Sequence, residues 1–139
     1  MQTLIRIADW SADNTLIKSI RRQVFIEEQR VPEELEWDDQ DETAQHCIAI
    51  MDNEAIATGR LQTDGQLGRM AVLKHFRGRG IGTDVLKFLI KLHQKKSSVP
   101  IIIHSQTHAI NFYKKLGFVI QGEEYYEAGI PHITMILNK

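Results

Sequence analysis

The sequence of 139 residues has little cysteine, only three prolines and no long apolar run. Its single cysteine, Cys47, excludes an internal disulfide and fits a reducing compartment. No apolar run approaches the roughly 20 residues that a membrane-spanning helix needs. The first residues also lack the basic and then apolar segments of a signal peptide. We therefore expect a cytoplasmic protein with no membrane partner.

An excess of charge of one sign is also missing. The chain has 17 basic and 18 acidic residues, and its formal net charge is −1. Because general binding to nucleic acid needs a basic surface, we expect no nucleic-acid partner, and any anion site must be local. The length and the apolar fraction of 42% are those of an ordinary globular domain. We find no linker or repeat, so residues 1–139 are expected to form a single domain.

The chain does contain alternating strand and helix patterns. Strands are predicted over 3–8, 66–72, 99–106 and 132–138, and a hairpin over 46–62 turns at Asp52-Asn53. Helices are predicted from Asp13 or Asn14 to about Glu28, from about 80 to 95, and over a short segment that Gly117 stops. This order predicts an α/β or α+β domain with a mixed, mostly antiparallel central sheet that is flanked by helices.

Residues 77–82 read Arg-Gly-Arg-Gly-Ile-Gly and stand at the start of the helix predicted over 80–95. The N-terminus of a helix presents unpaired N–H groups, and glycines let a phosphate approach the backbone closely. The helix dipole contributes roughly 0.3–1 kcal/mol, whereas each hydrogen bond to a charged group contributes roughly 1.5–3 kcal/mol. The stretch therefore predicts a phosphate cradle made mainly of backbone amides, with support from Arg77 or Arg79.

Two common phosphate motifs do not fit this stretch. The Walker pattern needs Lys-Ser or Lys-Thr after its last glycine, but Gly82 is followed by Thr83-Asp84. The dinucleotide fingerprint G-x-G-x-x-G differs in spacing from Gly78-x-Gly80-x-Gly82, and it opens a parallel domain rather than following a hairpin. The glycines could also be ordinary turn residues, so the stretch alone does not name its ligand.

The pattern Arg77-x-x-Gly80-x-Gly82 resembles the [Q/R]-x-x-G-x-[G/A] acetyl-CoA signature of the GNAT superfamily of N-acetyltransferases. It follows the strand end RMAV, and the later NFYKKLGF resembles the second element of that family. The stretches VFIEEQRVP and GIPHITM resemble a small bacterial branch of the superfamily. The resemblance implies an acetyl-CoA-dependent N-acetyltransferase, with a splay between the strands over 66–72 and 100–106.

The resemblance also implies residues for the cosubstrate acetyl-CoA. The signature backbone would bind the pyrophosphate, the preceding strand end would pair with the pantetheine arm, and the N–H of Val72 would polarise the thioester carbonyl. The residues so implied are Met70, Ala71, Val72, Arg77, Gly78, Arg79, Gly80, Ile81, Gly82, Thr83, Asn111 and Tyr113.

Tyr113 matches the tyrosine that donates a proton to the leaving CoA thiolate in that family. The attacking amine needs a base, because a lysine-like pKa of about 10.4 makes deprotonation at neutral pH cost roughly 4.6 kcal/mol. The candidates are Glu28, Asp38, Asp41, His46, Glu123 and His132. We expect Glu28, His46 and His132 to form the catalytic cluster. The acidic stretch 31–45 would suit a cationic amine acceptor, either a small molecule or a peptide.

Other interpretations of these residues remain open. Tyr113 and the histidines could serve packing alone, and the acidic stretch could be a solvated loop. His104 and His108 have no evident third ligand, so we expect no metal. Cys47 lies in an apolar strand pattern without a nucleophile's partners, which favours direct transfer. A non-catalytic acyl-CoA sensor or scaffold and another class of nucleotide-binding domain remain the alternatives, and the resemblance is compatible with a homodimer.

Overall fold

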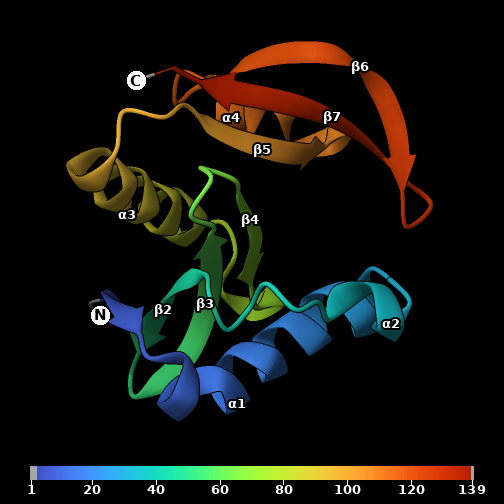
Figure 1. Cartoon of the computed structure of the whole chain (residues 1–139). Helices are drawn as coiled ribbons and strands as arrows, with labels where there is room; N and C mark the ends of the chain where they lie inside the picture. The colour runs from blue at the N-terminus through green and yellow to red at the C-terminus, as the bar shows by residue number, and fades with distance from the viewer. Residues whose placement is uncertain (1–2, 139) are drawn as a thin grey trace.

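Two antiparallel sheets, with helices around them, make up the part of the chain that the computed structural model describes, residues 3–138 (Figure 1). The first sheet has the strand order β1 (Thr3–Ala8), β2 (Gln45–Met51), β3 (Glu54–Leu61) and β4 (Leu67–Val72). The second has the order β5 (Ile101–Gln106), β7 (Ile130–Leu137) and β6 (Val119–Glu127). All strand pairs within each sheet are antiparallel in this part of the chain.

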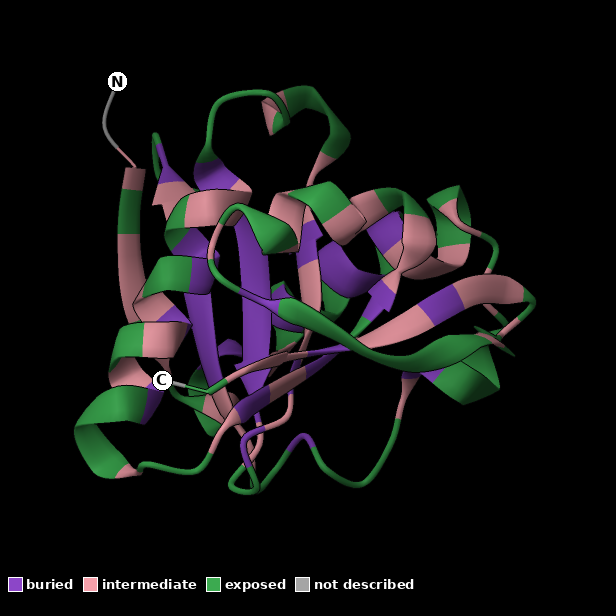
Figure 2. Cartoon of the chain, turned by 90° about the horizontal axis from the view of Figure 1, so that it is seen from above, coloured by how far each residue is buried: buried purple, intermediate pink, exposed green. Residues whose placement is uncertain are grey.

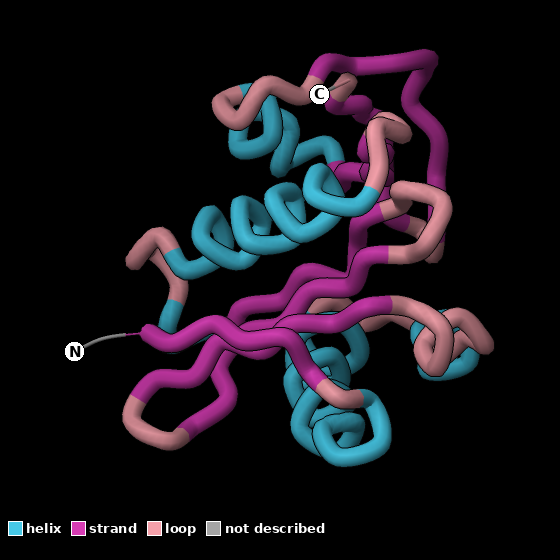
Figure 3. Tube along the Cα trace, turned by 60° about the vertical axis from the view of Figure 1, so that its left-hand side comes forward, coloured by secondary structure: helices cyan, strands magenta, loops and turns pink. Residues whose placement is uncertain are grey.

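The helical elements are α1 (Trp10–Arg21), the π-helical η1 (Arg22–Glu28), α2 (Glu33–Glu36), η2 (Lys74–Phe76), α3 (Ile81–Lys96), η3 (Thr107–Ala109) and α4 (Ile110–Lys114). Helix α1 covers one face of the first sheet and α3 covers the other (Figure 3). Each presents an apolar stripe, with Ile17 and Ile20 from α1 and Val85 and Leu89 from α3 fully or almost fully buried. Figure 2 shows the buried residues concentrated in the strands between these helices.

The two sheets diverge at β4 and β5. Within residues 3–138 these strands are joined by one parallel bridge between Gln66 and Ile102, where the Ile102 N–H also donates to the Gly65 carbonyl at 2.9 Å. Beyond that point β4 pairs with β3 and β5 pairs with β7. The predicted mixed, mostly antiparallel fold with a splay between these strands is therefore confirmed.

The start of the first helix differs from the prediction. Helix α1 begins at Trp10, because Asp9 caps it by accepting from the Ser11 N–H at 3.3 Å. Asp13 does not cap the helix. Its carboxylate binds both terminal nitrogens of Arg6 at 2.8 and 3.0 Å and the Asp9 N–H at 2.9 Å. Beyond Arg21 the helix widens into the π-helical η1, a distortion that often marks functional sites.

One strand was not predicted at all. β6 contains Gln121, Gly122, Glu123 and Glu124 in its middle, and the register shifts between Gln121 and Tyr125. Because β6 is a largely exposed edge strand, it needs no apolar alternation, and the usual sequence signal is missing. The hairpin prediction is confirmed: its turn is formed by Asp52 and Asn53, which have φ values of 52° and 67°. β7 begins at Ile130, slightly before the predicted start.

Candidate active site

A cleft of about 840 Å³ lies where the two sheets diverge. Its walls come from β4, β5 and β7. The helical η1, the region around α2, η3 and Tyr113 of α4 complete it. Among the residues that line it are Arg69 and Met70 of β4, His104 of β5, His132 of β7 and Tyr113 of α4. The splay between the sheets is therefore an accessible, largely polar cavity.

The glycine-rich loop leads into the first turn of α3. Gly78 and Gly80 have φ values of 79° and 80°, and a Cβ at either position would meet nothing within 4 Å. The Asp84 N–H donates to the Gly80 carbonyl at 3.1 Å, which closes the first turn. Within residues 3–138, no acceptor receives a hydrogen bond from the amides of residues 78–83. The loop thus presents a set of unpaired N–H groups at the positive end of the helix dipole.

The geometry explains why the last two glycines of the signature are not equivalent. Gly80 is in the left-handed region, which ordinary L-residues adopt at a cost. Gly82 lies in α3, and a Cβ there would make ordinary contacts with Val72 at 3.7 Å and Phe112 at 3.8 Å. The signature G-x-[G/A] fits this difference, because alanine is sterically acceptable at the second position only.

The two arginines of the loop have different partners. Arg77 makes a bidentate ion pair with Glu28 at 2.5 and 2.7 Å, and its Nε donates to the Val72 carbonyl at 2.9 Å. Arg79 lies over the ring of Phe76, 5.4 Å from the ring centroid. Arg77 therefore links the end of β4, the glycine-rich loop and η1.

Strand β4 is irregular just before its end. Val72 and Ala71 pair with β3 residues in regular register, but the register shifts between Thr58 and Arg60 on β3. Arg69, in the shifted part of β4, has a φ of 48°. Arg69 and Met70 both line the cleft, and the bulge is the irregularity that directs these consecutive residues to it.

Tyr113 packs edge-on against Phe112 and Phe118, with ring centroids 5.0 and 5.8 Å apart. Burial raises the pKa of Tyr113 to about 12, so its hydroxyl stays protonated at neutral pH. No hydrogen bond to this hydroxyl is present among the described residues. Tyr113 is partly buried and lines the cleft, so a hydroxyl without an internal partner is available there to a ligand. Asn111 lies on the same short helix and is exposed.

The predicted catalytic cluster does not form. Glu28 is held by Arg77, as described above. His46 is buried, stacks on Trp10 with ring centroids 4.6 Å apart, and lies with its Nε2 2.9 Å from the Asp41 carbonyl. Burial lowers the pKa of His46. Of the three predicted residues, only His132 lines the cleft. The three residues lie on different elements, Glu28 on η1, His46 on β2 and His132 on β7. Their positions near family motifs in the sequence therefore did not show whether their side chains meet.

His132 has a defined tautomer. Its Nδ1 is 2.7 Å from the Ile130 carbonyl, and because a carbonyl can only accept, Nδ1 carries the proton in the neutral ring. Nε2 is then the free acceptor. The ring also stacks on Tyr125 at 5.9 Å. His132 is thus a fixed imidazole with one basic nitrogen in the wall of the cleft.

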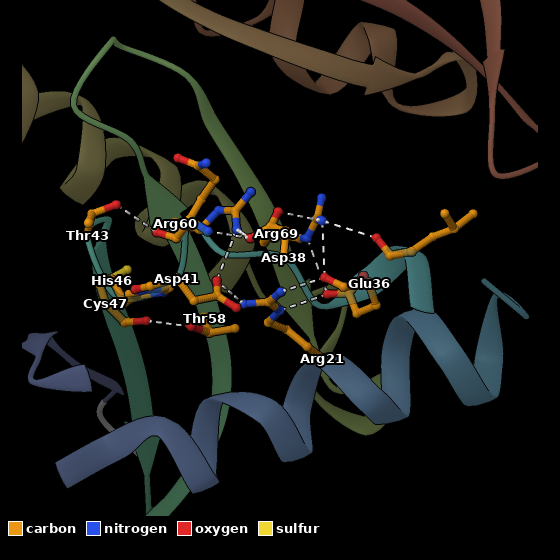
Figure 4. A network of polar contacts seen from close by, with 12 residues as sticks. Arg21, Glu36, Asp38, Asp41, Thr43, His46, Cys47, Thr58, Arg60 and Arg69 are labelled. Atoms are coloured by element: carbon orange, nitrogen blue, oxygen red, sulfur yellow. Dashed lines mark hydrogen bonds and ion pairs between the residues drawn. The ribbon is translucent and has the colours of Figure 1, made fainter. Parts of the chain in front are cut away.

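The acidic stretch is only partly a solvated loop, because two of its acids, Glu36 and Asp41, are buried. Figure 4 shows three of its carboxylates, from Glu36, Asp38 and Asp41, in a network with three arginines. Arg21 binds Glu36 at 2.7 Å and Asp41 at 2.8 Å. The other two arginines of the network are Arg60 and Arg69. These three carboxylates therefore already have positive partners. The stretch also contains the exposed acids Glu34, Asp39 and Glu42, and its use for a cationic acceptor stays a prediction.

Arg60 completes the paired part of the network. It binds Asp38 at 2.7 Å and Asp41 at 3.0 Å, and it is only 5% exposed. Burial works against its charge, yet the hydrogen bonds to Asp38 and Asp41 raise the pKa of Arg60. Nothing in the spacing of these residues along the chain marks them as partners, so the sequence analysis missed the network. Arginine is usually exposed, so the residue type gave no sign that Arg21 and Arg60 are buried.

A second chain of polar contacts crosses the cleft wall. The Gln106 amide donates to the Gln29 side-chain oxygen at 2.8 Å, and the Nε2 of His108 is 2.6 Å from the Gln106 oxygen. His104 instead contacts the Tyr125 hydroxyl at 2.7 Å. His104 and His108 thus have separate partners, and the described residues contain no group of three or more His, Cys, Asp or Glu side chains that could hold a metal ion.

Two sheets that splay beside a helix whose first amides are unpaired form the arrangement that the resemblance to the GNAT superfamily implies. The chain matches the acetyltransferase (GNAT) domain family over residues 8–139, and it therefore belongs to that family. The Bacillus subtilis protein YyaT is 39% identical over 122 residues, which cover 84% of this chain and 82% of YyaT. The predicted membership of the GNAT superfamily is confirmed.

Solved structures agree on the fold. An acyl-CoA N-acyltransferase from Pseudomonas aeruginosa superposes with a TM-score of 0.89 at 25% identity, covering 98% of this chain and 99% of that protein. A GNAT family acetyltransferase from Elizabethkingia anophelis with acetyl-CoA bound has a TM-score of 0.74 at 19% identity, covering 99% of this chain and 98% of that protein. Separately, no helix among residues 3–138 is long and apolar enough to cross a membrane.

Proposed function

We propose that the protein is an acetyl-CoA-dependent N-acetyltransferase that transfers an acetyl group to a primary amine by direct attack in a ternary complex. The observation that carries the proposal is the set of unpaired amides over residues 78–83. Gly82 of this set lies beside Val72 of β4 and beside Phe112, which precedes the cleft residue Tyr113. Family membership and the acetyl-CoA bound to the Elizabethkingia neighbour support acetyl-CoA as the donor.

The residues of the loop fit a CoA diphosphate. The amides of Gly78 to Thr83 would donate to its oxygens, and the open space at Gly78 and Gly80 admits a close approach. Met70, Ala71 and Val72 would pair with the pantetheine arm, and the N–H of Val72 would polarise the thioester carbonyl. Arg77, Arg79, Ile81, Gly82 and Asn111 would complete the cosubstrate site.

Tyr113 would act on the leaving thiolate. With a pKa of about 12 for the hydroxyl and about 8.5 for a thiol, full proton transfer is uphill by roughly 4.8 kcal/mol. The hydroxyl therefore stabilises the developing thiolate as a hydrogen-bond donor, and solvent supplies the proton afterwards. Burial favours this role, because it keeps the donor protonated across the physiological range.

His132 is the residue best placed to accept the proton of the amine. Its Nε2 is the unprotonated nitrogen of the neutral ring, and the residue lies in the cleft wall. Glu28 and His46 are not proposed as bases, because one is paired with Arg77 and the other is buried outside the cleft. A water molecule between the amine and His132 would serve the same purpose.

The test measures thiol release from acetyl-CoA with a panel of primary amines. We expect turnover with at least one amine, and a fall in kcat of about 10- to 100-fold for Tyr113→Phe, the loss of one hydrogen bond to a charged group. Calorimetry with CoA separates binding from turnover. CoA binding without thiol release across the panel would instead identify a non-catalytic acyl-CoA sensor, and absence of CoA binding would overturn the proposal.

We further propose a cytoplasmic location. Burial raises the pKa of the Cys47 thiol to about 12, so this single cysteine is an inert core residue that fits a reducing compartment. A homodimer and the organisation of residues 1–139 as one domain stay predictions.

A further inference from the structure

Arg69 occupies an unusual backbone position in the cleft. Its φ of 48° is in the left-handed region, which a long side chain rarely adopts. The residue directly precedes Met70, where we place the pantetheine arm, and both line the cleft. Strain of this kind persists where the surroundings enforce it, and such positions cluster at ligand sites. The unfavourable backbone conformation of Arg69 thus places a guanidinium in the wall of the proposed active-site cleft.

The guanidinium of Arg69 is only partly satisfied by the protein. Nη2 donates to the Glu36 carbonyl at 3.1 Å, to Asp38 Oδ2 at 3.2 Å and, at the longer distance of 3.5 Å, to the Leu35 carbonyl. Nε is 3.4 Å from Glu36 Oε2, but it is buried and makes no hydrogen bond within residues 3–138. Over the same residues Nη1 has no partner. In Figure 4, Arg69 lies at the side of the network that faces the second sheet.

The other two arginines of the network lie closer to their carboxylates, although the Nε of Arg60, like that of Arg69, is buried without a hydrogen bond within residues 3–138. Arg21 and Arg60 each have two carboxylate contacts between 2.7 and 3.0 Å, whereas the carboxylates near Arg69 are 3.2 and 3.4 Å away. The Arg21 side chain is fully buried, but that of Arg69 is 23% exposed. Burial lowers the pKa of Arg69, and the cations of Arg60 and Arg21 add to this effect against the attraction of Glu36 and Asp38. A further anion at Arg69 would therefore be stabilised.

We infer that Arg69 binds a carboxylate of the acceptor, so that the substrates are amino acids rather than simple amines or polyamines. Within residues 3–138 the Nη1 of Arg69 is unpaired, and a guanidinium N–H forms a charge-assisted hydrogen bond with a carboxylate. Arg69 and Met70 line the same cleft, so in this proposal the carboxylate and the amine of the acceptor lie in that cleft together. The inference rests on the proposed function, since it names the acceptor class for the same cleft.

Other charges in the cleft agree with an acceptor that has one carboxylate. Glu36 and Asp38 are paired with arginines, so they do not repel a carboxylate as free acids would. Asp64 and Glu127 also line the cleft, and no basic side chain within residues 3–138 forms an ion pair with either. Their negative charge attracts the ammonium group of an arriving amino acid.

The experiment compares matched acceptors that differ only at the carboxylate. Phenylalanine, phenylalaninamide and phenethylamine form one such set, and leucine, leucinamide and isopentylamine form another. Because the amine basicity differs within a set, the quantity compared is the ratio of kcat/KM between variant and wild type for each compound. We expect Arg69→Gln to lower kcat/KM about 10- to 100-fold for the amino acids and less than about threefold for the amides.

Arg22→Gln is the matched control. Arg22 precedes the cleft segment of η1, pairs with Glu33 at 2.7 Å and is 44% exposed, outside the cleft lining. This change should leave both ratios near one. Should Arg69→Gln fail to fold, Arg69→Lys keeps a cation for Glu36 and Asp38 but loses the planar fork, and the same selective loss is expected.

The inference and the proposed function fail in different ways. If the wild-type protein acetylates amides and simple amines as well as amino acids, the inference is overturned and the proposed function stands. An equal loss of kcat/KM for amino acids and amides in Arg69→Gln would have the same consequence. If CoA binds without turnover, calorimetric titration of the CoA-bound protein with the amino acids tests whether Arg69 binds their carboxylate. Binding that Arg69→Gln abolishes supports the inference, and absence of binding overturns it.

Discussion

Glu28 and Arg77 form a bidentate ion pair, with distances of 2.5 and 2.7 Å, that joins η1 to the glycine-rich loop. The same guanidinium donates to the Val72 carbonyl at 2.9 Å. The hydrogen bond from Arg77 lowers the pKa of Glu28, so the pair is intact at neutral pH. Three elements of the proposed site are thus held together by one arginine, which makes Glu28 a positioning residue.

A double-mutant cycle should show this coupling. We expect Glu28→Gln to raise the KM for acetyl-CoA about two- to fivefold, since a partly exposed pair contributes up to about 1 kcal/mol. Arg77→Gln should have at least the same effect, and the double variant should be no worse than Arg77→Gln. Steady-state kinetics give these values. A loss of kcat of about 100-fold or more for Glu28→Gln alone would show that Glu28 is the general base after all.

Alanine at the two signature glycines should have opposite effects on stability. Gly80→Ala places a Cβ on a residue with a φ of 80°, and we expect the free energy of unfolding to fall by about 1–2 kcal/mol. Gly82→Ala meets only ordinary contacts and adds helix propensity, so stability should be unchanged or rise by up to about 1 kcal/mol. Urea denaturation measures both. Equal destabilisation would show that the loop does not have this conformation.

Two adjacent arginines provide a matched test of the buried network. Arg21→Met leaves Glu36 and Asp41 buried without their shared cation, and we expect a loss of about 3–5 kcal/mol in the free energy of unfolding. Arg22→Met breaks only the exposed pair with Glu33, worth about 0–1 kcal/mol. The same denaturation experiment compares the two. Similar losses at both positions would contradict the buried arrangement.

His46 should make stability depend on pH. Burial lowers the pKa of His46 in the folded protein, so the unfolded chain binds the extra proton first as the pH falls. Its stabilising effect is therefore complete above the unfolded pKa of about 6.5 and declines below it, by up to about 1.4 kcal/mol per pH unit. His46→Gln should flatten the fall in unfolding free energy between pH 7.5 and 5.5. An unchanged slope would show that His46 titrates alike in both states.

Local sequence patterns predicted the turns and helices whose own residue types favour them. The hairpin turns where Asp52 and Asn53 stand, because these residues tolerate positive φ. The glycine-rich loop and α3 follow from residue types that suit a helix start, and the motif order placed the chain in its family. The short predicted helix ends near Gly117, which has a φ of 98°. By contrast, β6 was missed because an exposed edge strand carries no apolar alternation.

The sequence by itself determined the fold family and the glycine-rich start of α3 over residues 78–83, since both depend on backbone geometry that neighbouring residue types impose. Only the tertiary structure decided the partners of the charged side chains. It separated Glu28, His46 and His132, paired Glu28 with Arg77, and left Arg69 incompletely matched. Long-range ion pairs depend on which strands and helices meet in space, and no spacing along the chain encodes that meeting directly.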